Sequence, residues 1–92
     1  MEIVWDEDKR NSNLTKHGID FVDAVHVLYD EYALTIEDND HYEDRYIVIG
    51  EDSKQLILLV CYSYPDEDII RIISARKADK KQVKHYEKSR FQ

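Results

Sequence analysis

Residues 45–76 read RYIVIGEDSKQLILLVCYSYPDEDIIRIISAR, and this stretch decides the fold. Apolar runs at 45–49, 56–62 and 69–76 are separated by short polar turns, which is the pattern of consecutive strands. The run 56–62 is apolar at every position, so we expect a central strand that is covered on both faces. Because strands joined by short turns pair antiparallel, the stretch predicts an antiparallel meander.

The sequence on both sides of this stretch predicts helices that flank the meander. Asp6 and Asp20 are suited to cap helix N-termini, and Gly18 tolerates the left-handed conformation that ends a helix. The predicted outer elements are a strand at 3–5, helices at 6–18 and 20–29, a strand at 32–36 and a helix at 79–90. The expected order is therefore β-α-α-β-β-β-β-α, an α+β fold.

Length and composition predict one domain over residues 1–92. The chain is 42% hydrophobic and 36% charged, as in globular proteins. No apolar run approaches the roughly 20 residues of a membrane span, and the acidic N-terminus does not resemble a secretory signal. With Cys61 as the one cysteine, we expect a cytoplasmic protein in a reducing compartment.

Charge is unevenly distributed along the chain. Residues 71–92 hold eight Lys or Arg and two acidic residues, which gives them a net charge of +6. Since the whole chain has a net charge of −7, residues 1–70 have a net charge of −13. A local basic patch suits phosphate, and an acidic remainder attracts a basic partner. The alternative is a solvated C-terminal helix whose lysines keep the protein soluble.

Arginines on the predicted strands are the first candidates for chemistry. Arg71 lies among four isoleucines, where a guanidinium needs either a carboxylate or a groove at the sheet edge. If Arg71, Arg76 and Arg45 converge near one sheet end, they form a phosphate clamp, since each guanidinium presents a planar fork. A structural ion pair is the alternative for Arg71.

Lys16 and His17, directly before Gly18, are the second candidates. Histidines titrate near neutral pH, and a lysine adds charge for an anion. The alternative is that both cations satisfy the last carbonyls of the helix.

The usual signatures of metal and cofactor sites are absent from the sequence. The four histidines lack the spacing of metal ligands, so we predict no metal and no cofactor. His41, Glu43 and Asp44 are the one group that suits a divalent ion, although a hydrated loop of charges fits them better.

Three blocks of the sequence resemble the BrnT toxin family. The first block is Trp5, Asp6, Lys9, Asn13, Lys16, His17, Gly18, Phe21, Ala24 and Asp30, the second is 43–46 with Gly50, and the third is 71–78 with Tyr86 and Glu87. The likeness spans nearly the whole chain, and the first and last blocks at this separation are specific.

The resemblance implies a RelE-like ribonuclease toxin of a type II toxin–antitoxin pair. Such a protein cleaves RNA without metal, inhibits translation and is neutralised by a DNA-binding ribbon-helix-helix antitoxin of the BrnA type. It would itself bind DNA only through the antitoxin. We expect catalytic roles for Lys16, His17, Arg45, Asp44, Arg71 and Arg76, and substrate binding by Ser74, Lys77 and Tyr86.

Within these roles, the arginines stabilise charge, because arginine is a poor proton donor. His17 is the best proton-transfer group, and Glu43 or Asp44 is the fallback base. Two alternatives remain open: a weak or inactive binding module whose acidic face docks a basic DNA-binding partner, and a metal-dependent nuclease.

Overall fold

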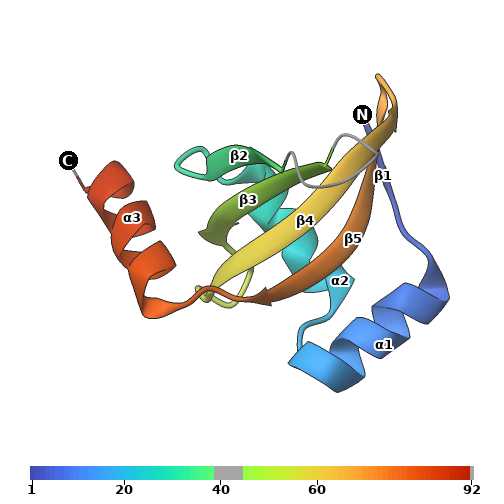
Figure 1. Ribbon diagram of the computed structural model, residues 1–92, viewed down its shortest axis with the longest axis horizontal. Coiled ribbons are helices and arrows are strands. Elements are labelled where there is room, and N and C mark those ends of the chain that lie inside the picture. The colour runs from blue at the N-terminus through green and yellow to red at the C-terminus, as the bar shows by residue number, and fades with distance from the viewer. Residues whose placement is uncertain (39–44, 92) are drawn as a thin grey trace.

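The computed structural model describes residues 1–38 and 45–91 of the chain. Its elements are β1 (Glu2–Val4), α1 (Glu7–His17), α2 (Phe21–Ala24), the 3₁₀ helix η1 (Val25–Tyr29), β2 (Leu34–Asp38), β3 (Arg45–Glu51), β4 (Ile57–Asp66), β5 (Ile69–Lys77) and α3 (Lys80–Arg90). They form an α+β fold around a five-stranded sheet of order β1-β5-β4-β3-β2 (Figure 1). No helix in these ranges is long and apolar enough to cross a membrane.

The sheet is mixed, which corrects the expectation of a purely antiparallel one. Strands β2 to β5 pair antiparallel in sequence order, as the turns predicted. The short β1 then joins β5 in parallel, with Glu2 opposite Ile69 and Val4 opposite Arg71. The whole meander separates β1 from β5 in sequence, so no turn dictates its direction.

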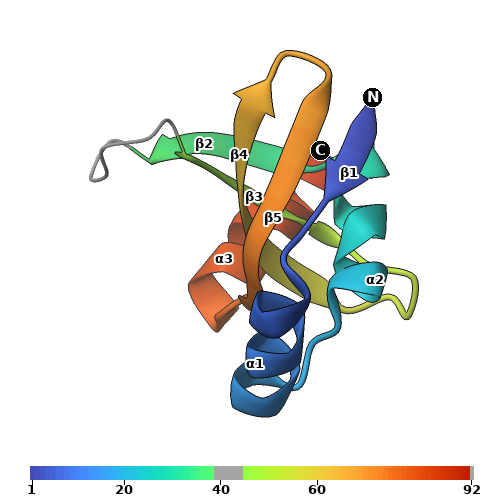
Figure 2. The ribbon, with the colours of Figure 1, turned by 90° about the vertical axis from the view of Figure 1, so that its right-hand side faces the viewer.

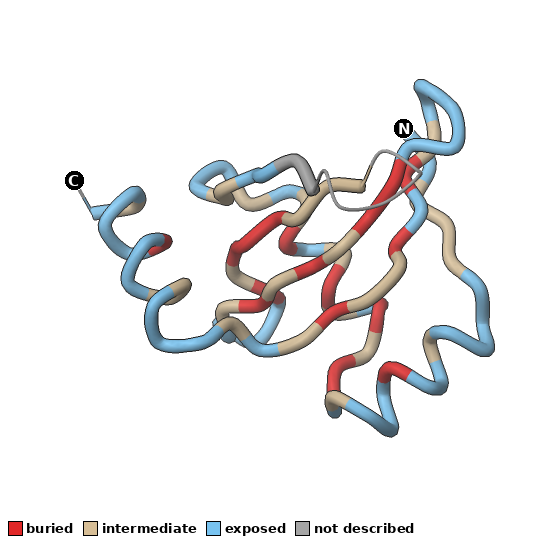
Figure 3. Tube along the Cα trace, in the orientation of Figure 1, coloured by how far each residue is buried: buried red, intermediate tan, exposed pale blue. Residues whose placement is uncertain are grey.

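The hydrophobic core lies between one face of the sheet and the helices α2 and η1. Phe21, Val27, Val60 and Ile72 are fully buried there, and complete burial of such a side chain is worth about 1.5–3 kcal/mol. Figure 3 shows the buried segments concentrated on the strands and on the helical segment that covers them.

The other face of the sheet, which we call the outer face, is less well covered. It carries residues 45, 47 and 49 of β3 with their partners on the neighbouring strands. Leu59 and Cys61 are half-buried on this face, and Ile36 is 55% exposed. The expectation that 56–62 is covered on both faces therefore holds for the core face and only in part for the outer face.

The predicted second helix is divided into α2 and η1. Asp20 caps it as expected, but after one turn the chain tightens into a 3₁₀ helix. β-branched valines in this segment lower its α-helical propensity. Gly50 of β3 lies against η1 so closely that a Cβ would come within 3.1 Å of Val27 Cγ1 and of Asp30 Oδ2.

Helix α3 stands apart from the sheet, on the opposite side from α2 (Figure 2). It begins at a capping box, in which the Asp79 side chain accepts from Gln82 N and the Gln82 side chain accepts from Asp79 N. The body holds α3 through Tyr86, which is 1% exposed, and Arg90, which pairs with Glu51 at 2.7 Å.

Candidate active site

Helix α1 carries the first group of candidate residues and lies beside β5. Asp6 caps its N-terminus by accepting from Asp8 N at 2.8 Å and Lys9 N at 3.1 Å. Its C-terminus ends at Gly18, which is left-handed with φ 71° and donates to Leu14 O at 2.9 Å. The predicted bounds of this helix are thus confirmed, and the last turn presents Lys16 and His17.

The buried Asn13 fixes α1 to the sheet. Strand β1 pairs only with residues 69–71, so the edge of β5 beyond them has no strand neighbour. The Asn13 amide takes that place: its Nδ2 donates to Ala75 O at 2.8 Å and its Oδ1 accepts from Ala75 N at 3.0 Å. The same Nδ2 donates to Ile19 O at 2.9 Å. One side chain therefore sets both the distance and the register between α1 and β5.

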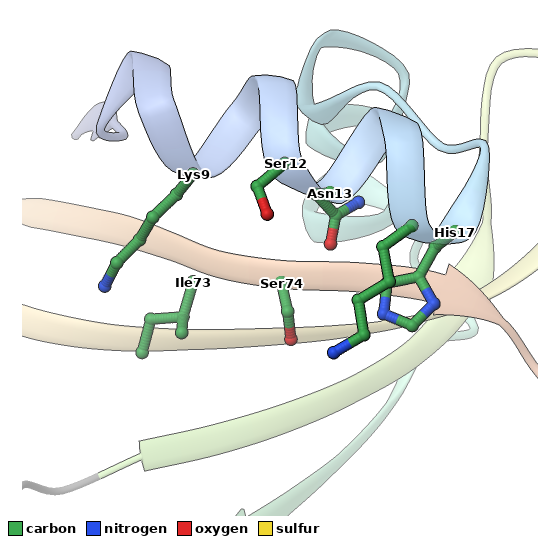
Figure 4. A pocket seen from close by; sticks show the side chains of 7 residues that line it. Lys9, Ser12, Asn13, His17, Ile73 and Ser74 are labelled. Carbon is green, nitrogen blue, oxygen red and sulfur yellow. The ribbon is translucent and has the colours of Figure 1, made fainter.

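A groove runs between α1 and β5, and we call it the α1–β5 groove. Its first hollow, of about 220 Å³, is lined by Lys9, Ser12, Asn13, Lys16, His17, Ile73 and Ser74 (Figure 4). A second hollow, of about 470 Å³, shares Lys9 and is otherwise lined by Val4, Trp5, Asp6 and Arg71. A register shift between β4 and β5 lies beside Ile73 and Ser74, and such bulges commonly re-aim side chains next to active sites.

The cations of this groove have no carboxylate partners. Lys9, Lys16 and Arg71 form no ion pair within residues 1–38 and 45–91. Asp6 is the one acidic residue among the described residues of the two linings, and its Oδ1 accepts the capping hydrogen bonds of α1. Unpaired lysine and arginine side chains in a concave site bind oxyanions such as phosphate.

The outer face adds two further arginines. Arg45 lies opposite Ser63, and Ser63 lies opposite Arg71, so the three form one row across β3, β4 and β5. Two strand spacings put the Cα atoms of the two arginines about 10 Å apart. Arg45 Nε is buried and has no hydrogen-bond partner in the described structure.

The third arginine lies further along β5. Arg76 is opposite Leu59, and its Nη1 donates to Lys77 O at 3.0 Å. The three arginines therefore share one face, but only Arg45 and Arg71 share a row. The structure therefore shows a line of positive charge along this face instead of the expected clamp at one sheet end.

The remaining predicted residues have mixed placements. Ser74 lines the groove, whereas Lys77 is opposite Leu58, on the core side of the sheet. Tyr86 lies outside the groove on α3, almost fully buried, and its hydroxyl donates to Asp30 at 2.5 Å. Asp44, with Glu43 and His41, lies outside the described residues.

Lys9 and Ser12 are groove residues to which the sequence assigned no site role, although Lys9 belongs to the family motif. Together with Asn13 and Lys16 they follow the spacing i, i+3, i+4 and i+7, which places side chains on one helix face. That periodicity was the available signal. It is usually read for apolar side chains, and here the stripe is polar.

In the described part of the chain, no three His, Cys, Asp or Glu side chains lie close enough together to hold a metal ion. The metal-dependent alternative rested on His41, Glu43 and Asp44, which lie outside that part. The groove itself offers lysines, an arginine and hydroxyls, a set that suits an anion better than a cation.

A second polar cluster lies far from the groove, where α3 meets the body. Burial opposes ionisation of Asp30, but hydrogen bonds from Tyr86 Oη, Glu51 N and Tyr32 N hold the pKa of this carboxyl below its ordinary value. Burial, reinforced by the hydrogen bond to Asp30, raises the pKa of Tyr86 to about 12. Tyr86 is therefore a neutral structural donor.

Comparisons with known proteins agree with this geometry. Residues 5–82 match the family described as "Ribonuclease toxin, BrnT, of type II toxin-antitoxin system". The crystal structure of the Brucella abortus ribonuclease toxin BrnT is similar, with TM-score 0.73, 34% identity and coverage of 87% of this chain and 99% of that one. No curated protein matches the chain. The matched region holds every lining residue of the α1–β5 groove except Val4 and most of the sheet, and the chain belongs to the BrnT family of ribonuclease toxins of type II toxin–antitoxin systems.

Proposed function

We propose that this chain is an endoribonuclease that cuts RNA in the α1–β5 groove without a metal ion, and that this activity inhibits translation. The observation that carries the proposal is the line of cations from Lys16 through Lys9 to Arg71, which have no ion-pair partner among the described residues, in an otherwise acidic protein. A RelE-like toxin domain over residues 1–92 accounts for the four antiparallel strands and the helices around them.

Cleavage of RNA without metal uses the ribose 2′-hydroxyl as nucleophile. A base removes its proton, the oxygen attacks the adjacent phosphorus, and an acid protonates the departing 5′-oxygen. The products are a 2′,3′-cyclic phosphate and a 5′-hydroxyl. The phosphorane formed on the way carries extra negative charge, so fixed cations beside the phosphorus lower its free energy.

Each groove residue then has a role in this reaction. His17 transfers protons, and Lys16 and Lys9 bind phosphate oxygens. Arg71, Arg45 and Arg76 stabilise the phosphorane, and each such donor is worth about 10²–10³ in rate. Ser74 and Ser12 are hydroxyl donors to the RNA backbone.

Three of the residues expected from the sequence have no direct role, or only a fallback role, in this proposal. Tyr86 is left out because it is buried and bonded to Asp30, and Lys77 is left out because it lies on the other side of the sheet. Asp44 stays the fallback base. Because no residue of the set needs a finely tuned pKa, we expect a slow enzyme.

Membership of a type II family implies an antitoxin partner. We propose that it is a BrnA-type, ribbon-helix-helix protein, and that the pair binds DNA through the antitoxin. The net charge of −13 on residues 1–70 favours a partner with a basic DNA-binding surface.

The test is cleavage of single-stranded and ribosome-associated RNA in EDTA. We expect the wild-type chain to cut and an Arg71→Ala/Arg76→Ala variant to lose at least about 10²-fold in rate. The control variant is Lys80→Ala/Lys84→Ala, which removes the same charge from exposed positions on α3 and should cut normally.

Other outcomes distinguish the competing functions. Cleavage that requires added metal, or that survives in the arginine variant, contradicts the mechanism. Absence of cleavage by any of the three proteins, with antitoxin binding intact, favours the non-enzymatic binding module.

A further inference from the structure

A second groove lies on the outer face, beneath the first turns of α3, and we call it the α3 groove. Its volume is about 540 Å³, within the range of pockets that take sizeable ligands. The floor is aliphatic, formed by Leu34, Ile36, Ile47, Ile49 and Leu59, and α3 contributes Asp79, Lys81, Gln82 and His85. Nothing in the proposed RNA chemistry uses this groove.

The floor of the α3 groove is apolar and only partly covered: Leu34, Ile47 and Leu59 are half-buried, and Ile49 is buried. Ile36 is 55% exposed, although it lies on a strand whose neighbours are partly covered. Contiguous exposed apolar surface with a polar rim is the mark of a protein-binding site. An RNA backbone gains little from five aliphatic side chains.

The α3 groove and the residue next to it carry a small excess of positive charge. Lys81 lies on α3, and Arg76 continues the row of Ile49 and Leu59 across the sheet. The Asp79 carboxylate accepts from Gln82 N at 2.8 Å in the cap of α3 and keeps its negative charge, so Lys81 and Arg76 together leave this rim with a net charge of +1. The complementary partner therefore carries carboxylates next to its aliphatic side chains.

The α3 groove lies near the α1–β5 groove on the outer face. On the outer face, Ile47 is followed across the strands by Cys61 and Ser74, and Ser74 lines the α1–β5 groove. Two strand spacings, about 10 Å, separate the apolar floor from this residue. A chain segment seated in the α3 groove is thus close enough to cover Ser74 and Arg76.

We infer that the α3 groove is where the antitoxin docks, through an aliphatic segment flanked by acidic residues. This inference rests on the proposed function, since it explains neutralisation: the aliphatic side chains fill the groove, and the carboxylates that follow cover Arg76 and the adjoining RNA site. The antitoxin thereby combines an acidic toxin-binding segment with a basic DNA-binding part.

The test is the affinity of this chain for its antitoxin, the protein encoded in the adjacent reading frame and purified separately. We expect Ile36→Glu to raise the Kd at least about tenfold, because it places a charge on the aliphatic floor. The matched control is Val22→Glu, since Val22 is 48% exposed on α2, which covers the opposite face of the sheet. This control should bind as wild type.

A second variant tests the charge of the rim without touching the floor. Lys81→Glu should weaken binding several-fold at low salt and less at high salt, because it is exposed and acts through charge. Calorimetry gives these affinities whether or not the chain cuts RNA. Loss of cleavage with the expected affinities therefore contradicts only the enzyme proposal.

Three results would overturn the inference. The first is wild-type affinity of Ile36→Glu, and the second is equal weakening by Val22→Glu. The third is a change in the solution mass of the isolated chain on Ile36→Glu, which would assign the groove to a second copy. If Ile36→Glu fails to fold by circular dichroism, unchanged low-salt affinity of Lys81→Glu alone contradicts the inference.

Discussion

At the scale of single residues, the main feature is which charges are paired. Arg10 binds Asp20 with Nε at 2.8 Å and Nη2 at 3.1 Å, and Arg90 binds Glu51. These arginines hold elements together. Lys9, Lys16 and Arg71 have no such partner in residues 1–38 and 45–91, so their charge is available to a ligand.

His17 is the residue whose replacement should affect chemistry alone. We expect His17→Gln to lower the cleavage rate by about 10²–10⁴ while RNA affinity stays within a few-fold, because glutamine hydrogen-bonds but does not transfer protons. Single-turnover cleavage and RNA binding measure the two effects. His26→Gln, an exposed histidine on η1, is the control. Equal cleavage rates for the two variants would assign proton transfer to another group.

Tyr86→Phe should lower stability and change its pH dependence. The variant loses the hydrogen bond to Asp30, a loss of about 1–3 kcal/mol at pH 7, measured by denaturant unfolding. Since folding raises the pKa of Tyr86 from 10.0 to about 12, its contribution is complete below pH 10 and is lost as pH rises toward 12.

The acid side of that prediction follows from Asp30. Hydrogen bonds, including the one from Tyr86, lower the pKa of Asp30 in the folded protein, against the effect of burial. Its contribution is therefore present above about pH 4 and lost as pH falls through the folded value. The stability difference between wild type and Tyr86→Phe should shrink at both ends of the pH range, and a constant difference would contradict this account.

At the scale of elements, the docking of α1 against β5 creates the site. The helix supplies Lys9, Lys16 and His17, the strand supplies Arg71 and Ser74, and Asn13 holds the two at a fixed distance. Neither element forms the groove alone.

Asn13→Leu should destabilise the protein and disable it. Leucine keeps the volume but leaves Ala75 N and two backbone carbonyls without their partner, which costs about 2–4 kcal/mol. Thermal unfolding measures the loss, and cleavage should fall further than stability explains because α1 is displaced. Asn11→Leu, at an exposed position of α1, is the control. Comparable stability of the two variants would show that Asn13 does not fix α1.

Much of this element arrangement was predictable from the sequence. The turns at 51–54 and near 66 fixed the meander, and Asp6, Gly18 and Asp20 marked helix ends. The parallel addition of β1 was not predictable, because pairing between distant segments has no local signal. The 3₁₀ turn in η1 and the extension of β4 to Asp66 also depend on tertiary contacts.

The site was predictable in part. Lys16, His17 and Ser74 do line one groove with Arg71 in its adjoining hollow, and the family motif located them. Tyr86 was expected to bind substrate but lies outside the groove. The sequence pattern of an amphipathic helix is the same whether its tyrosine contacts a ligand or a buried aspartate. The linear sequence also gives no indication that Arg71, and not Arg76, shares a row with Arg45, since this follows from strand register.

At the scale of the whole molecule, the separation of charge decides which ligands approach. The net charge is −7, yet the outer face and the α1–β5 groove carry Lys9, Lys16, Arg71 and Arg76. Most of the surface therefore repels nucleic acid, and one line attracts it. We expect RNA to bind in a single orientation and weakly outside this line.

The salt dependence of RNA binding should reflect this small number of cations. Four phosphate contacts predict a slope of log K against log salt of about −3 for single-stranded RNA. Fluorescence anisotropy with 2′-deoxy-substituted RNA, which lacks the attacking hydroxyl, measures the slope without cleavage. Lys16→Ala should reduce it by about 0.7, whereas Lys54→Ala, at an exposed residue paired with Asp23, should leave it unchanged. A slope near zero would contradict phosphate binding.

The amide of Asn13 has one more consequence, for solubility. An unpaired stretch of β5 is a template onto which another molecule can add a strand, and proteins avoid self-association by blocking such edges. The Asn13 side chain makes the hydrogen bonds with Ala75 that a further strand would make, so the sheet ends here without another strand. The arrangement that shapes the α1–β5 groove therefore also covers a strand edge that could otherwise template self-association.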